Sequence, residues 1–350
     1  MAVLFLFATF ADMIRDIENK SLLTRNSFGV QASCRQLIEY ETSEDLHTIF
    51  ADMICSCEKW MVLSGGNNVL FTEDYDGVIL HPVSDGIEIT SQTPDNTLVR
   101  VQAGVEWDDF VAWCVEHNLW GAENLSLIPG KVGAAPIQNI GAYGTEAADI
   151  IRSVEMFCTD TLNTLTLDAS YCGFGYRESI FKHSLKGRVV VTAVNFMLSR
   201  KAAPNLGYGA LSKHVEELGR PSLANIRRAV IDIRRSKLPD TSVTGNAGSF
   251  FKNPIVDAVT ADNLKKKFDT VPVYPTAHEG KVKIAAGWLI EKAGWKGRSD
   301  GAAGVHDRQA LVLINKGGAT GKQIIDLAKR IQSDVESMFG IRIETEVNIV

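Results

Sequence analysis

The sequence predicts a protein of mixed helices and strands, divided into two or three domains. Its 350 residues exceed the length at which a single hydrophobic core keeps growing. Apolar residues at helical spacing alternate along the chain with short apolar runs that suit strands. An apolar content of 45% with 22% charged residues is ordinary for a globular protein and argues against disorder.

The first helix is predicted from Ser43 to Cys57, and Thr42 with Asp45 can form a capping box at its start. Its apolar residues share one face: Leu46, Ile49, Phe50, Met53, Ile54 and Cys57. A strand over Trp60–Leu63 then runs into the glycine turn SGGNN at 64–68. This order follows β-α-β logic, in which ligands bind where the strand ends.

Further elements follow from the same periodicities. Strands are predicted near 78–81, 98–103, 150–157 and 188–198, and a second helix has Trp107, Phe110, Val111, Cys114 and Val115 at helical spacing. A third helix carries Ile226, Val230 and Ile233 on one stripe, and Pro239 in KLPD (237–240) ends it. That point is the predicted domain boundary.

The C-terminal region is predicted to contain a helix from Thr320 to Phe339 and a closing strand. Thr320 and Gln323 can form a capping box, and Gly340 supplies the stop. The closing strand IRIETEVNIV (341–350) alternates, with Ile341, Ile343, Val347 and Ile349 on one face and Arg342, Glu344 and Glu346 on the other.

Charge and cysteine usage exclude several classes of function. The formal net charge is −6 without a long Lys/Arg run, so neither nucleic acid nor anionic membrane is expected as the main partner. The six cysteines form no CxxC pair and the histidines show no metal-ligand spacing, so we expect reduced thiols and no metal site. The apolar run near the N-terminus covers about ten residues, too short to cross a bilayer. A cytoplasmic protein is expected.

Two glycine-rich stretches could bind phosphate. In SGGNN, successive backbone N–H groups could form a concave nest for a pyrophosphate, although a glycine pair after a strand is usually only a turn. GGATGK (317–322) resembles a Walker loop, but the first glycine is misplaced and Gln323 replaces Ser/Thr, so we interpret it as a helix start. No GxGxxG occurs, and a Rossmann nicotinamide site is therefore unsupported.

The segment LIPGKVGAAPIQNIGAYG (127–144) is the most unusual one. Its eighteen residues contain four glycines, two prolines and no carboxylate, which suits a regular helix poorly. A long buried loop would leave many backbone donors unpaired. A large, flat, hydrogen-bonding ligand such as a flavin with its diphosphate would satisfy those donors.

The stretch GNAGSFFKNP (245–254) places one hydroxyl, that of Ser249, between a glycine turn and two phenylalanines. The serine could fill space in the packing or take part in the reaction. A Ser-His-Asp hydrolase is unsupported because GxSxG is absent. Arg177 in FGYRES could equally form a surface salt bridge. The closing strand by itself does not favour Glu346 over Glu344.

Together these stretches resemble one family, UDP-N-acetylenolpyruvoylglucosamine reductase, the flavoenzyme of early peptidoglycan synthesis. The matching segments run in order through the chain: NSFGV (26–30), LSGGNNVLF (63–71), ENLSLIPGKVGAAPIQNIGAYG (123–144), FGYRESIFK (174–182), YGAL (208–211), KLPD (237–240), GNAGSFFKNP (245–254), AAGWLIEKAG (285–294), QALVLIN (309–315) and ETEV (344–347). The YGAL segment is similar to that of the subgroup that closes a tyrosine loop over the substrate.

The resemblance implies a role for each site residue. Ser249 would be the proton donor, and Arg177 and Glu346 would flank the enolpyruvyl carboxylate. The substrate-binding residues would be Tyr208, Lys237 and Asn253. Noncovalent FAD would lie against Gly65, Gly66, Asn67, Asn68, Ile128, Gly133, Ala134, Ile137 and Gly141. The sequence departs from the family at Ser64-Gly65-Gly66-Asn67, where Gly-x-Gly-Ser is frequent, and at Ala134-Ala135, where hydroxyl residues are common. Small residues and backbone donors remain at both, so binding is expected.

The implied fold is α+β, a two-part FAD-binding fold of the vanillyl-alcohol-oxidase/PCMH type plus a C-terminal α+β substrate-binding domain. The predicted parts are an N-terminal extension (1–20), FAD-binding subdomain 1 (21–86, joined by the terminal strand 344–350), FAD-binding subdomain 2 (87–236) and the C-terminal domain (237–343). The implied activity uses NADPH to reduce the enolpyruvyl group of UDP-N-acetylglucosamine enolpyruvate to UDP-N-acetylmuramate. A monomer is expected.

Two alternatives stay open at this point. An FAD-dependent oxidase of the same fold, acting on an alcohol or sugar, does not explain the 245–254 and 344–347 motifs. A catalytically silent nucleotide-sugar sensor would keep Tyr208 and Lys237 but would not need Ser249, Arg177 or Glu346.

Overall fold

The computed structural model describes residues 15–54, 59–268, 270–276 and 278–350. The chain forms two compact units. Unit 1 contains the segment up to Lys20, Cys34–Ser64 and Asp76–Asp232. Unit 2 contains Ser21–Ser33, Gly65–Tyr75 and Ile233–Val350. The domain division given above stays a prediction.

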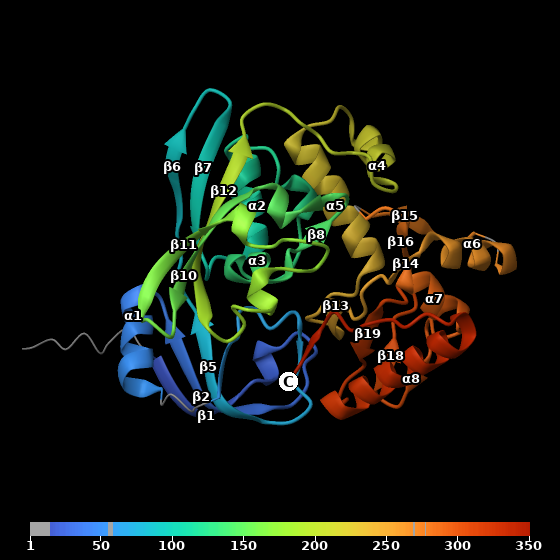
Figure 1. The fold of residues 1–350 in the computed structure, drawn as a ribbon, viewed down its shortest axis with the longest axis horizontal. Helices are drawn as coiled ribbons and strands as arrows, with labels where there is room; N and C mark the ends of the chain where they lie inside the picture. The colour runs from blue at the N-terminus through green and yellow to red at the C-terminus, as the bar shows by residue number, and fades with distance from the viewer. Residues whose placement is uncertain (1–14, 55–58, 269, 277) are drawn as a thin grey trace, which may run out of the picture. The chain divides into compact units, whose positions relative to one another are not determined.

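The first sheet of unit 1 has the strand order β1-β2-β5-β3, seen at the lower left of Figure 1. Its strands are β1 (Arg15–Ser21), β2 (Ser33–Tyr40), β3 (Trp60–Val62) and β5 (Tyr75–Pro82), and β3 pairs parallel with β5. The strands predicted at 60–63 and 78–81 are therefore confirmed. Ile38, Val78 and Leu80 from this sheet share a buried core with Leu46 and Ile49.

The helix beside this sheet starts as predicted but ends early. Thr42 and Asp45 form the capping box at the start of α1 (Ser43–Thr48). A π-helical turn over Ile49–Met53 follows, in which the N–H of Ile54 donates to the carbonyl of Ile49, five residues back. This extra residue shifts the helical register, and Ile54 leaves the helix with extended backbone. The prediction of one helix through Ile54 is wrong, and Cys57 lies outside the described residues.

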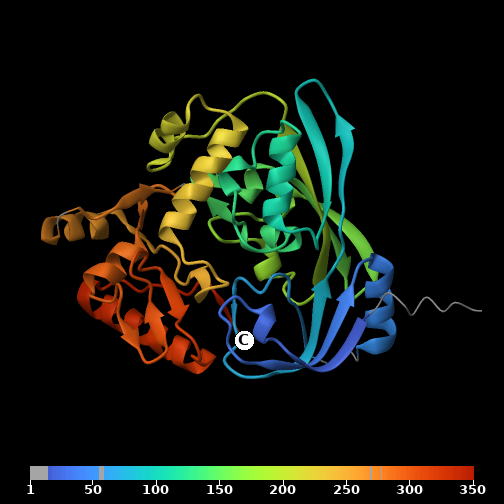
Figure 2. The ribbon, with the colours of Figure 1, turned by 180° about the vertical axis from the view of Figure 1, so that it is seen from behind.

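A five-stranded antiparallel sheet forms the larger part of unit 1. Its order is β11-β10-β12-β7-β6, built from β6 (Ile87–Gln92), β7 (Asn96–Gln102), β10 (Ile151–Cys158), β11 (Asn163–Asp168) and β12 (Val189–Ser199). Helix α2 (Trp107–Glu116) runs along this sheet in Figures 1 and 2, and Trp107 and Phe110 pack against Phe196 of β12. Both helix and strand predictions are confirmed here. Two further helices follow β12, α4 (Leu211–Leu218) and α5 (Leu223–Lys237), of which only α5 was predicted.

Unit 2 is built around the antiparallel sheet β13-β19-β18-β17. Its strands are β13 (Gly245–Ser249), β17 (Ser299–Asp300), β18 (Ala303–Val305) and β19 (Val312–Asn315), and α7 (Ala286–Lys292) and α8 (Gly321–Phe339) accompany them, with α8 packed on β18 and β19. A smaller sheet, β14-β16-β15, contains β14 (Ile255–Asp257), β15 (Val273–Pro275) and β16 (Lys281–Ile284), with α6 (Ala258–Lys267) beside it.

The start and stop signals predicted for α8 are confirmed. Thr320 and Gln323 form the capping box, and Gly340 ends the helix in the left-handed conformation at φ +67°. Gly321 is required by packing as well, because a Cβ atom there would lie 1.8 Å from the carbonyl oxygen of Phe71. The GGATGK stretch is thus a capped helix start, as interpreted from the sequence.

The closing stretch differs from the predicted strand. Among the described residues 341–350, the strand is limited to β20 (Asn348–Ile349), which lies parallel to β4 (Val69–Leu70), and Thr345 forms an isolated bridge to Phe251. Ile341, Ile343 and Val347 are buried as the alternation predicted, but Ile349 is 41% exposed. The alternation in burial therefore holds up to Val347 and fails at Ile349, which lies in the two-stranded sheet β20-β4.

Candidate active site

The SGGNN turn belongs to unit 2 from Gly65 onward. Gly66 has φ +65°, and a Cβ atom there would lie 2.0 Å from the carbonyl oxygen of Arg25, so only glycine fits. Its carbonyl accepts a hydrogen bond from the N–H of Ser27 at 3.0 Å. Within the described chain, the N–H groups of residues 65–68 donate to no protein carbonyl. Such a row of available donors is the arrangement that binds an anionic group.

The 127–144 segment of unit 1 pairs its backbone better than predicted. It forms two short helices, Val132–Ala134 and α3 (Ala135–Gln138), and a small hairpin of β8 (Gly141–Ala142) and β9 (Thr145–Glu146). The N–H groups of Val132 and Gly133 donate to the carbonyls of Val105 and Ala103, each at 2.9 Å. Protein backbone thus satisfies several donors of this segment, and the flavin contact predicted for the rest stays a prediction.

The predicted flavin residues within this segment have visible structural roles. Gly133 is required by packing, since a Cβ atom would lie 2.6 Å from the Cβ of Ala103. The side chains of Ile128 and Ile137 pack at the edge of the unit 1 core. Ala134 precedes α3, and Gly141 begins β8.

Unsatisfied buried atoms indicate a polar ligand at the family segments. Six buried side-chain atoms among the described residues have no hydrogen-bond partner, and three of these lie in matching segments: Ser27 Oγ, Ser64 Oγ and Asn124 Oδ1. A buried polar atom without a partner destabilises the fold unless a ligand or water reaches it. Within unit 2, the available N–H groups of residues 65–68 and Ser27 Oγ are the kind of donors and acceptors that the polar groups of a flavin dinucleotide can bind.

Arg177 lies in a tight turn of unit 1. Gly175 and Glu178 exchange two backbone hydrogen bonds of 3.0 and 3.1 Å, which places Tyr176 and Arg177 at its tip. Arg177 has φ +57°, a left-handed conformation that such turns normally reserve for Gly or Asn. Holding a large side chain there costs about 1–3 kcal/mol, a strain that concentrates at functional sites.

The guanidinium of Arg177 is aimed by backbone carbonyls. Nη2 donates to the carbonyl of Gly141 at 2.8 Å and Nη1 to that of Asn139 at 3.3 Å. The group also lies 5.4 Å from the ring centroid of Tyr176. A Cβ atom at Gly141 would approach Nη1 to 3.0 Å, so the glycine leaves room for the arginine. Arg177 is thereby held as a fixed, planar cation.

Asn139 is a buried residue whose side chain connects three segments of unit 1, a role that the sequence analysis did not predict. It has φ +43° at the end of α3 and is fully buried. Its Nδ2 donates to Glu146 Oε2 at 2.8 Å and to the carbonyl of Gly175 at 2.9 Å, and its Oδ1 accepts from the N–H of Ala148. The amide therefore joins α3, the β9 end and the turn that carries Arg177.

Tyr208 lies on an exposed segment of unit 1. Its ring packs edge-on against Tyr143, with 6.2 Å between the centroids and 89° between the planes. Tyr208 itself is 47% exposed, and Tyr143 has a left-handed φ of +49°. The two rings form an aromatic corner beside Gly144.

Ser249 is the last residue of β13 in unit 2 and follows an irregularity in the pairing of that strand. The pairing with β19 shifts between Asn246 and Ser249, and Gly248 between them has φ +67°. Bulges of this kind re-aim a side chain and occur next to active sites. Phe250 and Phe251 are fully buried core residues, and Phe250 packs against Phe28. The two phenylalanines thus fix the backbone on which the Ser249 hydroxyl is presented.

Glu346 is placed beside the Ser249 segment. Its N–H donates to the carbonyl of Phe250 at 2.8 Å, and its carbonyl accepts from Asn68 Nδ2 at 3.3 Å. Glu344 is exposed, and its carbonyl accepts from the N–H of Lys252. The backbone of Glu346 therefore contacts both the residue after Ser249 and the SGGNN turn, and the choice of Glu346 over Glu344 stays a prediction.

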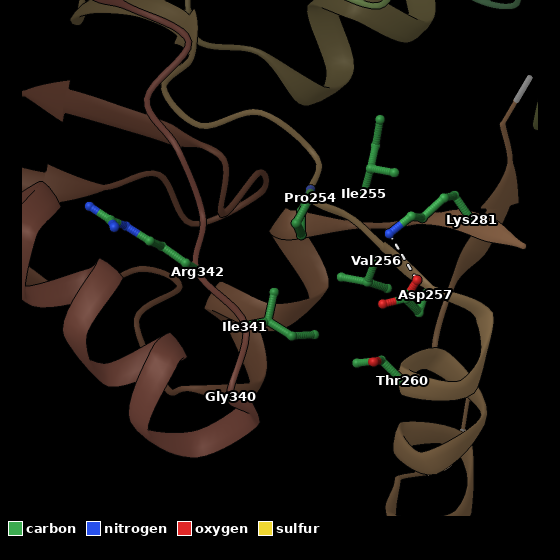
Figure 3. Close-up of a pocket in the computed structure, with 9 residues that line it drawn as sticks. All are labelled: Pro254, Ile255, Val256, Asp257, Thr260, Lys281, Gly340, Ile341 and Arg342. Atoms are coloured by element: carbon green, nitrogen blue, oxygen red, sulfur yellow. Dashed lines mark ion pairs between the residues drawn. The ribbon is translucent and has the colours of Figure 1, made fainter. Parts of the chain in front are cut away.

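Asn253 and Lys237 also belong to unit 2. Asn253 Oδ1 accepts the N–H of Ala286 at 2.9 Å, which caps the start of α7. Lys237 is exposed at the end of α5. The residues directly after Asn253 line a pocket of about 290 Å³, which is drawn in Figure 3. In this pocket Lys281 forms an ion pair with Asp257 at 2.8 Å. The side chain of Arg342 points away from it, and no predicted site residue lines it.

The structure therefore gathers the predicted residues in two groups. In unit 1, Gly141 and Arg177 meet directly, with Tyr208 beside the same hairpin. In unit 2, the Ser249 segment, Glu346 and Asn68 meet. No group of three or more His, Cys, Asp or Glu residues in the described ranges could hold a metal ion. The described helices include none with the length and apolarity needed to cross a membrane.

Comparison with known proteins finds a family match for an N-terminal and a C-terminal region of the chain. Residues 35–161 match the FAD binding domain family, and residues 239–350 match the C-terminal domain of UDP-N-acetylenolpyruvoylglucosamine reductase. The reductase of that name from Bacteroides fragilis strain YCH46 is 44% identical over 330 residues, which cover 94% of this chain and 98% of the relative. The Pseudomonas aeruginosa PAO1 reductase is 44% identical over 334 residues, covering 95% and 98%.

A solved structure supports the fold. The crystal structure of UDP-N-acetylenolpyruvylglucosamine reductase from Thermus caldophilus matches with a TM-score of 0.67 at 23% identity, covering 96% of this chain and 98% of that one. The fold is thus α+β, with an FAD binding domain and an added C-terminal domain, as predicted. On the 44% identity over nearly its whole length, the chain belongs to the UDP-N-acetylenolpyruvoylglucosamine reductase family.

Proposed function

We propose that the protein reduces the enolpyruvyl group of UDP-N-acetylglucosamine enolpyruvate to give UDP-N-acetylmuramate, with NADPH as the reductant, in peptidoglycan synthesis. The full-length similarity to reductases of that name supports the substrate. The observation that carries the chemistry is the pairing of residues 250–252 with 344–346, which sets the Ser249 segment beside Glu346. We also propose a cytoplasmic monomer with the domain boundaries given above.

In the proposed reaction, each of the site residues would have a separate role. Bound FAD supplies the transfer of a hydride from NADPH to the terminal vinyl carbon of the substrate. Arg177, fixed by the carbonyls of Gly141 and Asn139, would stabilise the negative charge that develops on the substrate carboxylate. Glu346, paired with Arg177, would flank the other edge of that carboxylate. Ser249 would deliver the proton to the adjacent carbon, which completes the lactyl ether.

We further propose that Gly65, Gly66, Asn67 and Asn68 bind the flavin diphosphate through backbone N–H groups. Ile128, Gly133, Ala134, Ile137 and Gly141 would also contact the flavin. Because Gly133 and Gly141 are already required by close approaches inside the protein, their contribution would be to shape the site rather than to supply a hydrogen bond.

The test of this function is a product assay. The purified protein should turn over NADPH beyond one equivalent of enzyme only when UDP-N-acetylglucosamine enolpyruvate is added, and mass spectrometry should show a product heavier by two hydrogens. An FAD-dependent oxidase would instead consume oxygen with an alcohol or sugar. A silent sensor would bind the UDP-sugar without oxidising NADPH. Either result would replace the proposal.

The purified protein is expected to be yellow, with FAD bound noncovalently. The SGGNN turn and the 124–144 segment contain no histidine or cysteine that could form a covalent flavin bond. Denaturation followed by filtration should therefore release all of the flavin from the chain. Flavin that stays with the denatured polypeptide would contradict this, as would a colourless protein that takes up no added FAD.

Tyr208 and Lys237 are expected to act in binding of the UDP-sugar. A diphosphate needs donors and positive charge that the reacting carbons do not require. Tyr208→Phe and Lys237→Ala should each raise the substrate KM, while the rate at which NADPH reduces the enzyme changes little. Steady-state and rapid-mixing kinetics on both variants measure this, with Lys322→Ala on the exposed face of α8 as a control for loss of a lysine. Unchanged KM values in both variants would remove the two residues from the substrate site.

A further inference from the structure

The segment that carries Tyr208 is attached to unit 1 at few points. Residues 201–207 form no helix or strand, and residues 202–205 and 207 are exposed. Before it, Arg200 and Lys201 are anchored to the β6–β7 turn through Thr93 and Asp95. In the described chain, the hydrogen bonds that tie residues 202–207 to the rest of unit 1 all pass through Asn205.

Two asparagine amides make this attachment. Asn205 Nδ2 donates to the carbonyl of Gly144 at 2.9 Å and to Thr145 Oγ1 at 3.3 Å. In return, Asn124 Nδ2 donates to the carbonyl of Asn205 at 2.8 Å and to that of Tyr143 at 2.9 Å. Asn124 is 1% exposed, so one half of the arrangement is rigidly placed and the other half lies at the surface.

The glycines around Tyr208 leave its backbone conformationally permissive. Glycines lie on both sides of the tyrosine, and a Cβ atom at Gly207 or Gly209 would contact nothing within 4 Å. Gly209 also has φ +59°. At Gly144, by contrast, a Cβ atom would lie 3.4 Å from Asn205 Nδ2 and 3.5 Å from the Cβ of Tyr208. The glycine at 144 therefore lets the segment come close to the hairpin turn.

We infer that Asn205, together with Asn124, is a latch that holds the Tyr208 segment against the β8–β9 turn in the substrate-binding position. The inference rests on the proposed function, because Tyr208 is proposed to bind the UDP-sugar. Asn205 is a positioning residue that touches no reacting atom. Losing the two side-chain hydrogen bonds of Asn205 loosens the segment, which the bond from Asn124 to the Asn205 carbonyl and the contact of Tyr208 with Tyr143 still hold in part. Substrate binding then benefits from a segment that is already in place.

The kinetic test is Asn205→Ala with Asn163→Ala as its control. Asn163 is an exposed asparagine of unit 1 on β11, so the control makes the same chemical change away from the latch. Asn205→Ala should raise the KM for the UDP-sugar by roughly tenfold, as expected for two surface hydrogen bonds. Reduction by NADPH should stay at the wild-type rate. Asn205→Asp, which keeps the shape but turns an acceptor toward the Gly144 carbonyl, should be at least as impaired.

A second readout does not depend on turnover. Trypsin cleavage after Lys201, followed by mass spectrometry, reports how freely the segment leaves the body of unit 1. Cleavage should be several-fold faster in Asn205→Ala than in wild type and Asn163→Ala, and the melting temperatures should be equal. If wild type shows no turnover but Asn205→Ala is cleaved faster, the proposed function fails and the latch stands. If wild type turns over but Asn205→Ala matches it in both KM and cleavage, the latch is wrong.

Discussion

Ser249→Ala is expected to fold normally and to be reduced by NADPH at close to the wild-type rate, yet to lose its reaction with the enolpyruvyl substrate. The change removes one hydroxyl at the end of β13 and leaves the buried Phe250 and Phe251 in place. Transfer of reducing equivalents from NADPH needs no proton from Ser249. Protonation of the substrate carbon does, and positioned proton donors of this kind contribute about 10²–10⁴-fold. The second half-reaction should therefore slow by that factor.

Rapid-mixing absorbance on each half-reaction separately measures this effect. Ser249→Cys keeps a transferable proton and should recover part of the loss. Ser337→Ala, at an exposed position of α8, serves as the matched control and should behave as wild type. Equal slowing of both half-reactions, or of neither, would show that the serine is packing filler and not the reagent.

Arg177→Lys is expected to lose most of its turnover although the positive charge is kept. The guanidinium uses two nitrogens to reach the carbonyls of Asn139 and Gly141, and this fixes its plane. A lysine ammonium is a point charge on a flexible chain, so it cannot hold both carbonyls and also present a planar fork to a carboxylate. The loss should fall on the reaction with the enolpyruvyl substrate, where negative charge develops.

The control for this variant is Arg152→Lys. Arg152 is an exposed arginine of unit 1 that pairs with Asp168 at 3.3 Å, and the same substitution there should leave both half-reactions intact. Arg177→Lys should also keep the wild-type melting temperature within a few degrees, because the residue at the strained position stays large. Near-normal turnover of Arg177→Lys would mean that Arg177 is not the partner of the developing charge.

Local signals predicted most of the fold. Capping boxes at Thr42 and Thr320, the proline after α5 and the glycine after α8 all depend on residues a few positions apart, and the structure confirms each. The errors occur at a local irregularity and where partners are distant. The end of the first helix shifts through a π turn, and the closing stretch pairs only briefly with β4 and Phe251. Periodicity in the chain does not report which strand a segment will meet.

The candidate site shows the same limit. The family segments supplied the site residues as predictions, but not what holds them. Asn139 joins three segments that are up to 36 positions apart, and Asn124 reaches Asn205 across 81 positions. Such connections leave no periodic pattern in the sequence, since the sequence does not distinguish a buried asparagine from one in an exposed turn. The left-handed φ of Arg177 was equally hidden, because glycine or asparagine is the usual residue at that position.

The central claim is that the reduced enzyme passes its reducing equivalents to an enolpyruvyl UDP-sugar. The most direct test mixes NADPH-reduced protein, under exclusion of oxygen, with UDP-N-acetylglucosamine enolpyruvate and follows the absorbance of the bound flavin. We predict that oxidised-flavin absorbance returns rapidly and in proportion to the substrate added, while UDP-N-acetylglucosamine without the enolpyruvyl group has no effect. If the absorbance returns only when oxygen is admitted, the protein is not the proposed reductase.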